Sequence, residues 1–220
     1  MNKSRKPAVE KRLKREKERR TEEILQAARN VILDKNFSGA TMDDIAAEAG
    51  ITKPTIYQYF STKDELFVRM IEPMIESLAT KLEEIRNNLS GKKYITGKTI
   101  VKDVFNVYYS TFEKDPDLFR LFNIFLQVGI VNKMNNEAAL IIKKWGKKSF
   151  EEGNLIVAAA VEQGLFREID IHHTTDFVWG SFWGIVQVEQ NKWGREGISR
   201  FLKPVLEYAE NLLITALVKK

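Results

Sequence analysis

Residues 41–60 read TMDDIAAEAGITKPTIYQYF, and this stretch decides the fold of the protein. Thr41 and Asp44 have the spacing of a capping box, in which each side chain accepts a hydrogen bond from the other residue's backbone. A short helix is therefore predicted to begin here and to run to Ala49. Gly50 is predicted to end it, because glycine tolerates a positive φ.

A second short helix is predicted directly after this turn. Thr52 can cap it, and Pro54 suits its first turn because the missing N–H there would have no partner inside the helix. We expect the helix to end at Phe60. Two helices that cross steeply need small residues where their backbones approach and apolar side chains that pin them together. The small residues are Ala46, Ala49 and Gly50, and the apolar ones are Ile45, Ile51, Ile56 and Phe60.

Helices are also predicted on both sides of this pair. Upstream, apolar residues recur every three or four positions over residues 24–32, so a helix is expected to end near Asn36 and to begin as early as Lys11. Downstream, Ser61 and Thr62 can cap a longer amphipathic helix that reaches residue 86.

The rest of the chain shows helical patterns after a loop expected at residues 87–99. No segment alternates apolar and polar residues convincingly, so the fold class is predicted as all-α, with about nine helices. We expect a basic extension at residues 1–20, a three-helix domain that contains the helix pair at 21–66 and a larger helical domain at 67–220. The further helices are expected at residues 100–113, 116–128, 137–163 and 174–191, with a last one ending near residue 218.

Composition limits the possible functions. The chain has 220 residues, 44% of them hydrophobic, and it has no cysteine, which excludes disulfides and thiol catalysis. The longest apolar stretch is too short to span a bilayer, so a cytoplasmic protein is expected, with no membrane partner. His172 and His173 are adjacent and so diverge, and they are interpreted as part of a linker. No catalytic residue, metal site or cofactor is predicted.

The net charge of +5 is concentrated at the amino terminus. Residues 1–20 hold ten Lys or Arg and three Glu, whereas the remainder is slightly acidic. Such a segment is either a solvated arm or an arm that follows DNA phosphates, and charge alone does not separate these readings.

The second short helix indicates nucleic-acid binding. Its outward side chains can donate hydrogen bonds to phosphates or base edges, and no acid lies between Thr52 and Lys63 to repel DNA. These side chains are Lys53, Thr55, Tyr57, Gln58 and Tyr59.

Residues 22–67 also resemble the TetR family of transcriptional regulators. The resemblance rests on Thr-x-x-x-Ile-Ala-x-x-Ala-Gly-Ile from Thr41, on the aromatic end of the second helix and on Ser-x-Lys-Asp-Glu-Leu-Phe from Ser61. It implies a recognition helix over residues 53–60, although Pro54 stands where many members have glycine. It implies phosphate contacts by Tyr57, Tyr59 and Lys63, and base contacts by Thr55 and Gln58. The predicted DNA-binding set is Thr41, Thr52, Lys53, Pro54, Thr55, Tyr57, Gln58, Tyr59 and Lys63.

The resemblance implies that the carboxy-terminal region binds a ligand and dimerises. As a group, large aromatic side chains on several helices could line a cavity for a small apolar or aromatic effector, although at any single position ordinary core is the favoured interpretation. The predicted ligand-binding residues are Phe105, Tyr108, Phe112, Phe122, Phe125, Trp145, Trp179 and Trp183. The last two helices would form the homodimer interface, with burial inside one chain as the alternative. The predicted interface residues are Phe177, Gly180, Gly184, Val188, Leu206, Leu213 and Leu217.

These observations predict a homodimeric transcriptional regulator that binds a pseudo-palindromic double-stranded DNA site and acts as a repressor released by its ligand. It is not expected to be an enzyme. A helical DNA-architecture protein and a helical small-molecule carrier without DNA binding are the alternatives. An architectural protein would need no ligand cavity, and a carrier would leave the donors of the second short helix unexplained.

Overall fold

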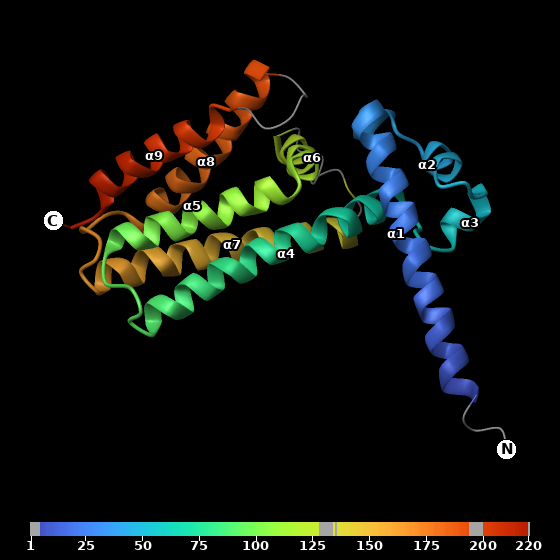
Figure 1. Cartoon of the computed structure of the whole chain (residues 1–220), viewed down its shortest axis with the longest axis horizontal. Helices are drawn as coiled ribbons and strands as arrows, with labels where there is room; N and C mark the ends of the chain where they lie inside the picture. Colours follow the sequence, from blue (N-terminus) through green and yellow to red (C-terminus); the bar gives the residue numbers. More distant parts are fainter. Residues whose placement is uncertain (1–4, 128–133, 135, 194–199, 220) are drawn as a thin grey trace. The chain divides into compact units, whose positions relative to one another are not determined.

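The computed structural model describes residues 5–127, 134, 136–193 and 200–219, and all regular elements within these ranges are helices. They divide into two compact units. The first comprises Met1–Pro73 and Arg120–Ile141, and the second comprises Met74–Phe119 and Ile142–Lys220. The prediction of an all-α fold is confirmed. Figure 1 shows the elements, which are α1 (Arg5–Gly39), α2 (Met42–Glu48), α3 (Lys53–Tyr57), α4 (Lys63–Ser90), α5 (Gly97–Lys114), α6 (Pro116–Gln127), α7 (Asn136–Glu162), α8 (Ile171–Trp193) and α9 (Leu202–Leu217).

In the first unit, α1 packs on α2, and α2 packs on α3. The helix α1 begins at Arg5, before the earliest start expected from the sequence, because Pro7 falls in its first turn, where proline is tolerated. The helix is interrupted near its end by Asn36, with a φ of 57°. Ile24, Ile32 and Phe67 are fully buried and form part of the core of this unit.

In the second unit, α9 packs against both α5 and α8. The loop predicted at residues 87–99 is shorter in the structure, because α4 continues to Ser90 and α5 begins at Gly97. Leu89 is fully buried and holds the last turn of α4 in place. A side chain at Gly97 would lie 2.5 Å from the carbonyl oxygen of Leu165, so only glycine fits the start of α5.

Candidate nucleic-acid interface

The capping box at the start of α2 is confirmed. The hydroxyl of Thr41 accepts a hydrogen bond from the backbone N–H of Asp44 at 3.1 Å, and the Asp44 carboxylate accepts one from the N–H of Thr41 at 3.0 Å. Lys35 of α1 donates to the same carboxylate at 2.8 Å. The Asp44 carboxylate also accepts a hydrogen bond from the Thr41 hydroxyl at 2.7 Å. The bond from Lys35, followed by those from the Thr41 hydroxyl and N–H, lowers the pKa of Asp44 to about 2.

The turn after α2 also follows the prediction. Gly50 has a φ of +63°, and the N–H of Ile51 donates to the carbonyl of Ala46 at 2.9 Å. Ile45 and Ile56 are fully buried, and Phe60 is nearly so. These apolar contacts hold α3 against α2 and fix which of its faces points outward.

The helix α3 is shorter than predicted, because it ends at Tyr57 rather than Phe60. The N–H groups of Tyr59 and Phe60 both donate to the carbonyl of Ile56 at 3.0 Å, so the last residues form a tightened turn. Gln58 is therefore the C-cap residue of α3.

The side-chain cap predicted for Thr52 is wrong, because its hydroxyl makes no hydrogen bond to the helix backbone. It lies 2.8 Å from the hydroxyl of Thr55 instead. The backbone carbonyl of Thr52 still accepts from the N–H of Thr55 and of Ile56, so the residue starts the helix without a side-chain cap.

The structure brings most of the predicted DNA-contact residues together on one exposed surface, formed by α3 and the turn after it. Five of its members are exposed and available to a partner, while Thr55 and Tyr59 are half-buried. Thr41 is also exposed, at the start of α2. The exposed members on α3 and its flanks are Thr52, Lys53, Pro54, Tyr57 and Gln58.

An acidic residue does approach this surface, from a different helix. Asp43 of α2 forms an ion pair of 2.9 Å with Lys53, and this hydrogen bond raises the pKa of the lysine. Both side chains are 60% exposed, so the pair is weak and can open when a phosphate approaches. Asp43 lies outside the acid-free segment from Thr52 to Lys63, so the sequence of that segment does not reveal it.

Lys63, in the first turn of α4, is held by the protein itself. Its ammonium donates to the backbone carbonyls of Phe37 at 2.6 Å and Ala40 at 2.8 Å, and lies 4.3 Å from the centre of the Phe37 ring. Burial lowers its pKa. This geometry favours a structural role for Lys63 over the phosphate contact that the resemblance implies.

Comparison with known proteins finds a family match for the segment that contains α2 and α3. Residues 24–70, which contain the carboxy-terminal part of α1, both short helices and the first turns of α4, match the family described as bacterial regulatory proteins, tetR family. This part of the chain therefore has the sequence of a TetR-family segment. The match lies wholly within the first compact unit.

Among the relatives, the HTH-type transcriptional activator FasR of Mycolicibacterium smegmatis is 34% identical over 68 residues, which are 31% of each chain. The chain therefore aligns with about a third of that relative's length. Two solved structures share the fold over most of the chain. SmeT, described as the repressor of a Stenotrophomonas maltophilia multidrug efflux pump, has a TM-score of 0.69 at 20% identity and covers 91% of both chains. FadR from Bacillus subtilis, in complex with stearoyl-CoA, has a TM-score of 0.61 at 21% identity, covering 84% of this chain and 95% of its own.

In the second unit, the predicted ligand-binding aromatics pack against other aromatic rings, several of which were not predicted to bind a ligand, such as Phe119 and Phe182. Tyr108 contacts the rings of Trp179 and Phe182, with centroids 5.2 and 5.4 Å apart, and Trp183 stacks on Phe119 at 4.3 Å. Phe105 and Phe112 are also buried, and Trp145 is half-buried. Phe122 is buried in the first unit, and the side chain of Phe125 lies outside the described residues.

An apolar cavity of about 30 Å³ lies within the second unit. Tyr108 is the one predicted ligand-binding residue in its lining, and the rest is largely aliphatic, including Val104, Ile156 and Val178. The cavity has the volume of roughly one water molecule, whereas sites for small organic ligands typically have at least about 300 Å³. A ligand of that size would have to open it.

The predicted dimer interface divides into two groups. Leu206, Leu213 and Leu217 of α9 are at most 8% exposed and form part of the chain's own core, so they offer little surface to a partner. Phe177 and Val188 of α8 are 65% and 49% exposed. On α9 the exposed apolar residues are Tyr208 and Leu212, at 66% and 54%.

Gly180 and Gly184 are exposed one turn apart on α8, and a Cβ added at either would meet no described atom within 4 Å. Packing within the chain therefore does not explain why these positions lack side chains.

His172 and His173 are exposed at the start of α8, with the Nδ1 of His173 3.3 Å from Asp170. Among the residues that the structure describes, no group of His, Cys, Asp and Glu could hold a metal ion. The described helices include none that is both long enough and apolar enough to cross a membrane.

Proposed function

We propose that this chain is a homodimeric transcriptional regulator of the TetR family that represses its target by binding a specific DNA site and leaves that site when a small apolar or aromatic ligand binds. The observation that carries the proposal is the exposed surface of α3 and its turn, with Lys53, Tyr57 and Gln58 presented by two helices fixed through buried contacts. The DNA-reading part would be residues 21–66, and the ligand-binding and dimerisation part residues 67–220.

Gln58 and Tyr57 would make two different kinds of contact with DNA. An exposed glutamine amide can bond to an adenine edge bidentately, which gives sequence preference. A tyrosine hydroxyl that contacts a phosphate adds affinity without reading the sequence.

Dimerisation would use the exposed apolar surface of α8 and α9. Phe177, Val188, Tyr208 and Leu212 are each about half or more exposed, and the two exposed glycines of α8 would let a partner helix approach closely. A twofold dimer would present two recognition helices, which must lie about 34 to 36 Å apart to enter successive major grooves. Its DNA site would then be pseudo-palindromic.

Release by a ligand is supported by the apolar cavity in the second unit. Because the cavity holds about one water molecule, a larger ligand can bind only to a rearranged state. A ligand that prefers one conformation shifts the population toward it, and couplings of about 1 to 3 kcal/mol are typical. The stearoyl-CoA bound to FadR shows that a protein of this fold can hold a long apolar chain.

The proposal is tested by selecting duplexes from a random pool with the purified chain at two salt concentrations and sequencing those retained. We expect an enriched pseudo-palindrome. Salt-sensitive binding without an enriched motif would instead indicate an architectural protein, and no binding would indicate a carrier. Transcription from a promoter that contains the selected site then distinguishes repression from activation, and titration of apolar compounds tests release.

A further inference from the structure

The amino-terminal part of α1 is a helix that lies outside the family match. Residues 5–20, here named the basic arm, precede the matched segment, which begins at residue 24. At 1.5 Å per residue the arm is about 24 Å long. All side chains from Val9 to Arg19 are exposed, and Figure 1 shows α1 running well past α2 and α3 toward the amino terminus.

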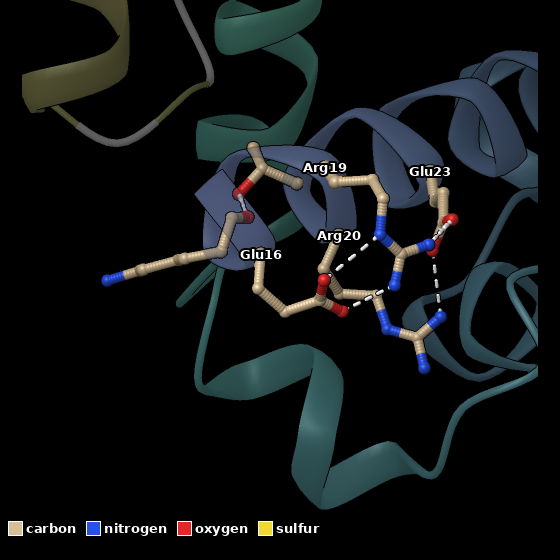
Figure 2. A network of polar contacts seen from close by, with 6 residues as sticks. Glu16, Arg19, Arg20 and Glu23 are labelled. Carbon is tan, nitrogen blue, oxygen red and sulfur yellow. Dashed lines mark hydrogen bonds and ion pairs between the residues drawn. The ribbon is translucent and has the colours of Figure 1, made fainter. Parts of the chain in front are cut away.

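An ion-pair network keeps the end of the basic arm helical where it joins the rest of α1 (Figure 2). Arg19 binds the carboxylates of Glu16 and Glu23, and Arg20 binds Glu23 at 2.9 Å. The hydrogen bond from Arg19 is the main cause of the lowered pKa of Glu16. These pairs are three and four residues apart, the spacing that stabilises a helix, so the arm has a defined direction.

The basic arm has an excess of positive charge that these pairs do not neutralise. It holds nine Lys or Arg and three Glu, and two of its acids are already paired, Glu16 with Arg19 and Glu18 with Lys14. No ion pair joins Lys11, Arg12 or Arg15 to any residue that the structure describes. Helical spacing places these three cations within about 100° of one another around the helix.

This charge pattern fits nucleic acid better than a second copy of the arm. Val9 and Leu13 are 54% and 64% exposed and four residues apart, but two apolar positions fall short of the repeat that a coiled coil requires. Two arms side by side would also repel each other. A DNA backbone, in contrast, releases counterions for each phosphate that a cation neutralises.

We propose that the basic arm lies along the phosphate backbone beside the DNA site, with Lys11, Arg12 and Arg15 as phosphate contacts. The arm then extends the contact beyond the helix-turn-helix and adds affinity without sequence preference. This inference rests on the proposed DNA-binding function and identifies a second surface through which that function acts.

The test compares the full chain with the variant Lys11→Gln/Arg12→Gln/Arg15→Gln on the selected duplex over a range of salt concentrations. Each lost phosphate contact lowers the slope of log affinity against log salt by about 0.9, so the loss of three contacts from each arm of the proposed dimer should lower the slope by about 5. Hydroxyl-radical footprinting should lose protection at the flanks of the site. The control Lys98→Gln/Lys114→Gln/Lys143→Gln removes the same charge from exposed positions of the second unit and should change neither result.

Circular dichroism shows whether the arm stays helical, and the charge-preserving variant Lys11→Arg/Arg12→Lys/Arg15→Lys should keep the parent's slope. If the parent binds but the neutral variant has the parent's slope and footprint, the arm proposal alone is overturned. A change in oligomeric state with an unchanged slope would overturn it in favour of contact between arms. If the parent binds no duplex, the proposed function fails, and the arm proposal fails with it.

Discussion

The ammonium of Lys63 lies 2.8 Å from the backbone carbonyl oxygen of Ala40 and 2.6 Å from that of Phe37. These bonds connect the first turn of α4 to the end of α1, where Asn36 is not in a helical conformation. Carbonyls at a helix end lack partners within the helix, and a cation is a favourable one. Lys63 therefore joins two helices of the DNA-reading unit.

We expect Lys63→Met to lower the free energy of unfolding by about 1 to 3 kcal/mol, because hydrogen bonds to a charged group are lost at a half-buried site. Urea unfolding measures this change. The salt dependence of DNA binding should stay the same, since the ammonium is engaged by carbonyls. A slope lower by about 1.8, one contact from each protomer of the dimer, with unchanged stability would instead place Lys63 on a phosphate.

Gln58→Ala should relax sequence preference, because the exposed amide would no longer reach a base edge. Discrimination against the wrong base at one position of each half-site should fall by about 1 to 3 kcal/mol. Tyr57→Phe, which removes only a hydroxyl, should weaken binding to all sequences alike. Competition binding with single-base variants of the selected duplex measures both effects. Gln26→Ala, an exposed glutamine of α1, is the control, and equal loss on specific and random DNA for Gln58→Ala would contradict base reading.

Asp44 should stabilise the protein only while it is ionised. Its pKa in the folded chain is about 2, below the ordinary 3.8, because Lys35 and Thr41 bind the carboxylate. A lowered folded pKa adds stability above the unfolded value, and that stability is lost as the pH falls from about 4 through about 2. Asp44→Asn should therefore destabilise the chain at about pH 5 and have little effect near pH 2.

Denaturant unfolding at both pH values checks this prediction, and a ¹³C titration of the Asp44 carboxyl gives the pKa directly. Asp176→Asn, at an exposed position on α8, serves as the control. A midpoint near 3.8 for Asp44 would show that the capping box and the Lys35 bond do not persist in solution.

Two substitutions on α8 and α9 should separate the dimer surface from the core. Phe177→Arg puts a charge on a side chain that is 65% exposed, so it should yield folded monomers. Leu213→Ala creates a cavity at a residue that is 4% exposed, so it should cost about 2 to 5 kcal/mol of stability and leave the dimer intact. Analytical ultracentrifugation and urea unfolding give the two readouts. Dissociation by Leu213→Ala without loss of stability would instead place it in the interface.

Local rules explain what the sequence predicted well. The capping box of Thr41 and Asp44 depends on residues three positions apart, and the positive φ of Gly50 depends on one residue alone. Burial of Ile45 and Ile56 follows from the need to join two short helices. None of these features requires knowledge of distant parts of the chain.

Local rules say less where two distant segments meet. An apolar stripe on α9 does not say whether Leu213 faces its own chain or a partner, and the structure places it inside. The engagement of Lys63 with carbonyls 23 and 26 positions away, and of Lys53 with Asp43 of the neighbouring helix, cannot be read from spacing. The early end of α3 depends on a single carbonyl, that of Ile56, which accepts two donors.

The small size of the cavity in the second unit also has a consequence for measured affinities. If the state that admits a ligand makes up a fraction f of the molecules, the apparent dissociation constant equals the intrinsic one divided by f. The structure shows the cavity at about 30 Å³, so a larger ligand binds only the molecules in which it has opened. A substitution that enlarges the cavity, such as Ile156→Ala, would therefore tighten ligand binding even if it removed a contact with the ligand. Affinity for an inducer would then report on how easily the core opens as much as on how well the compound fits.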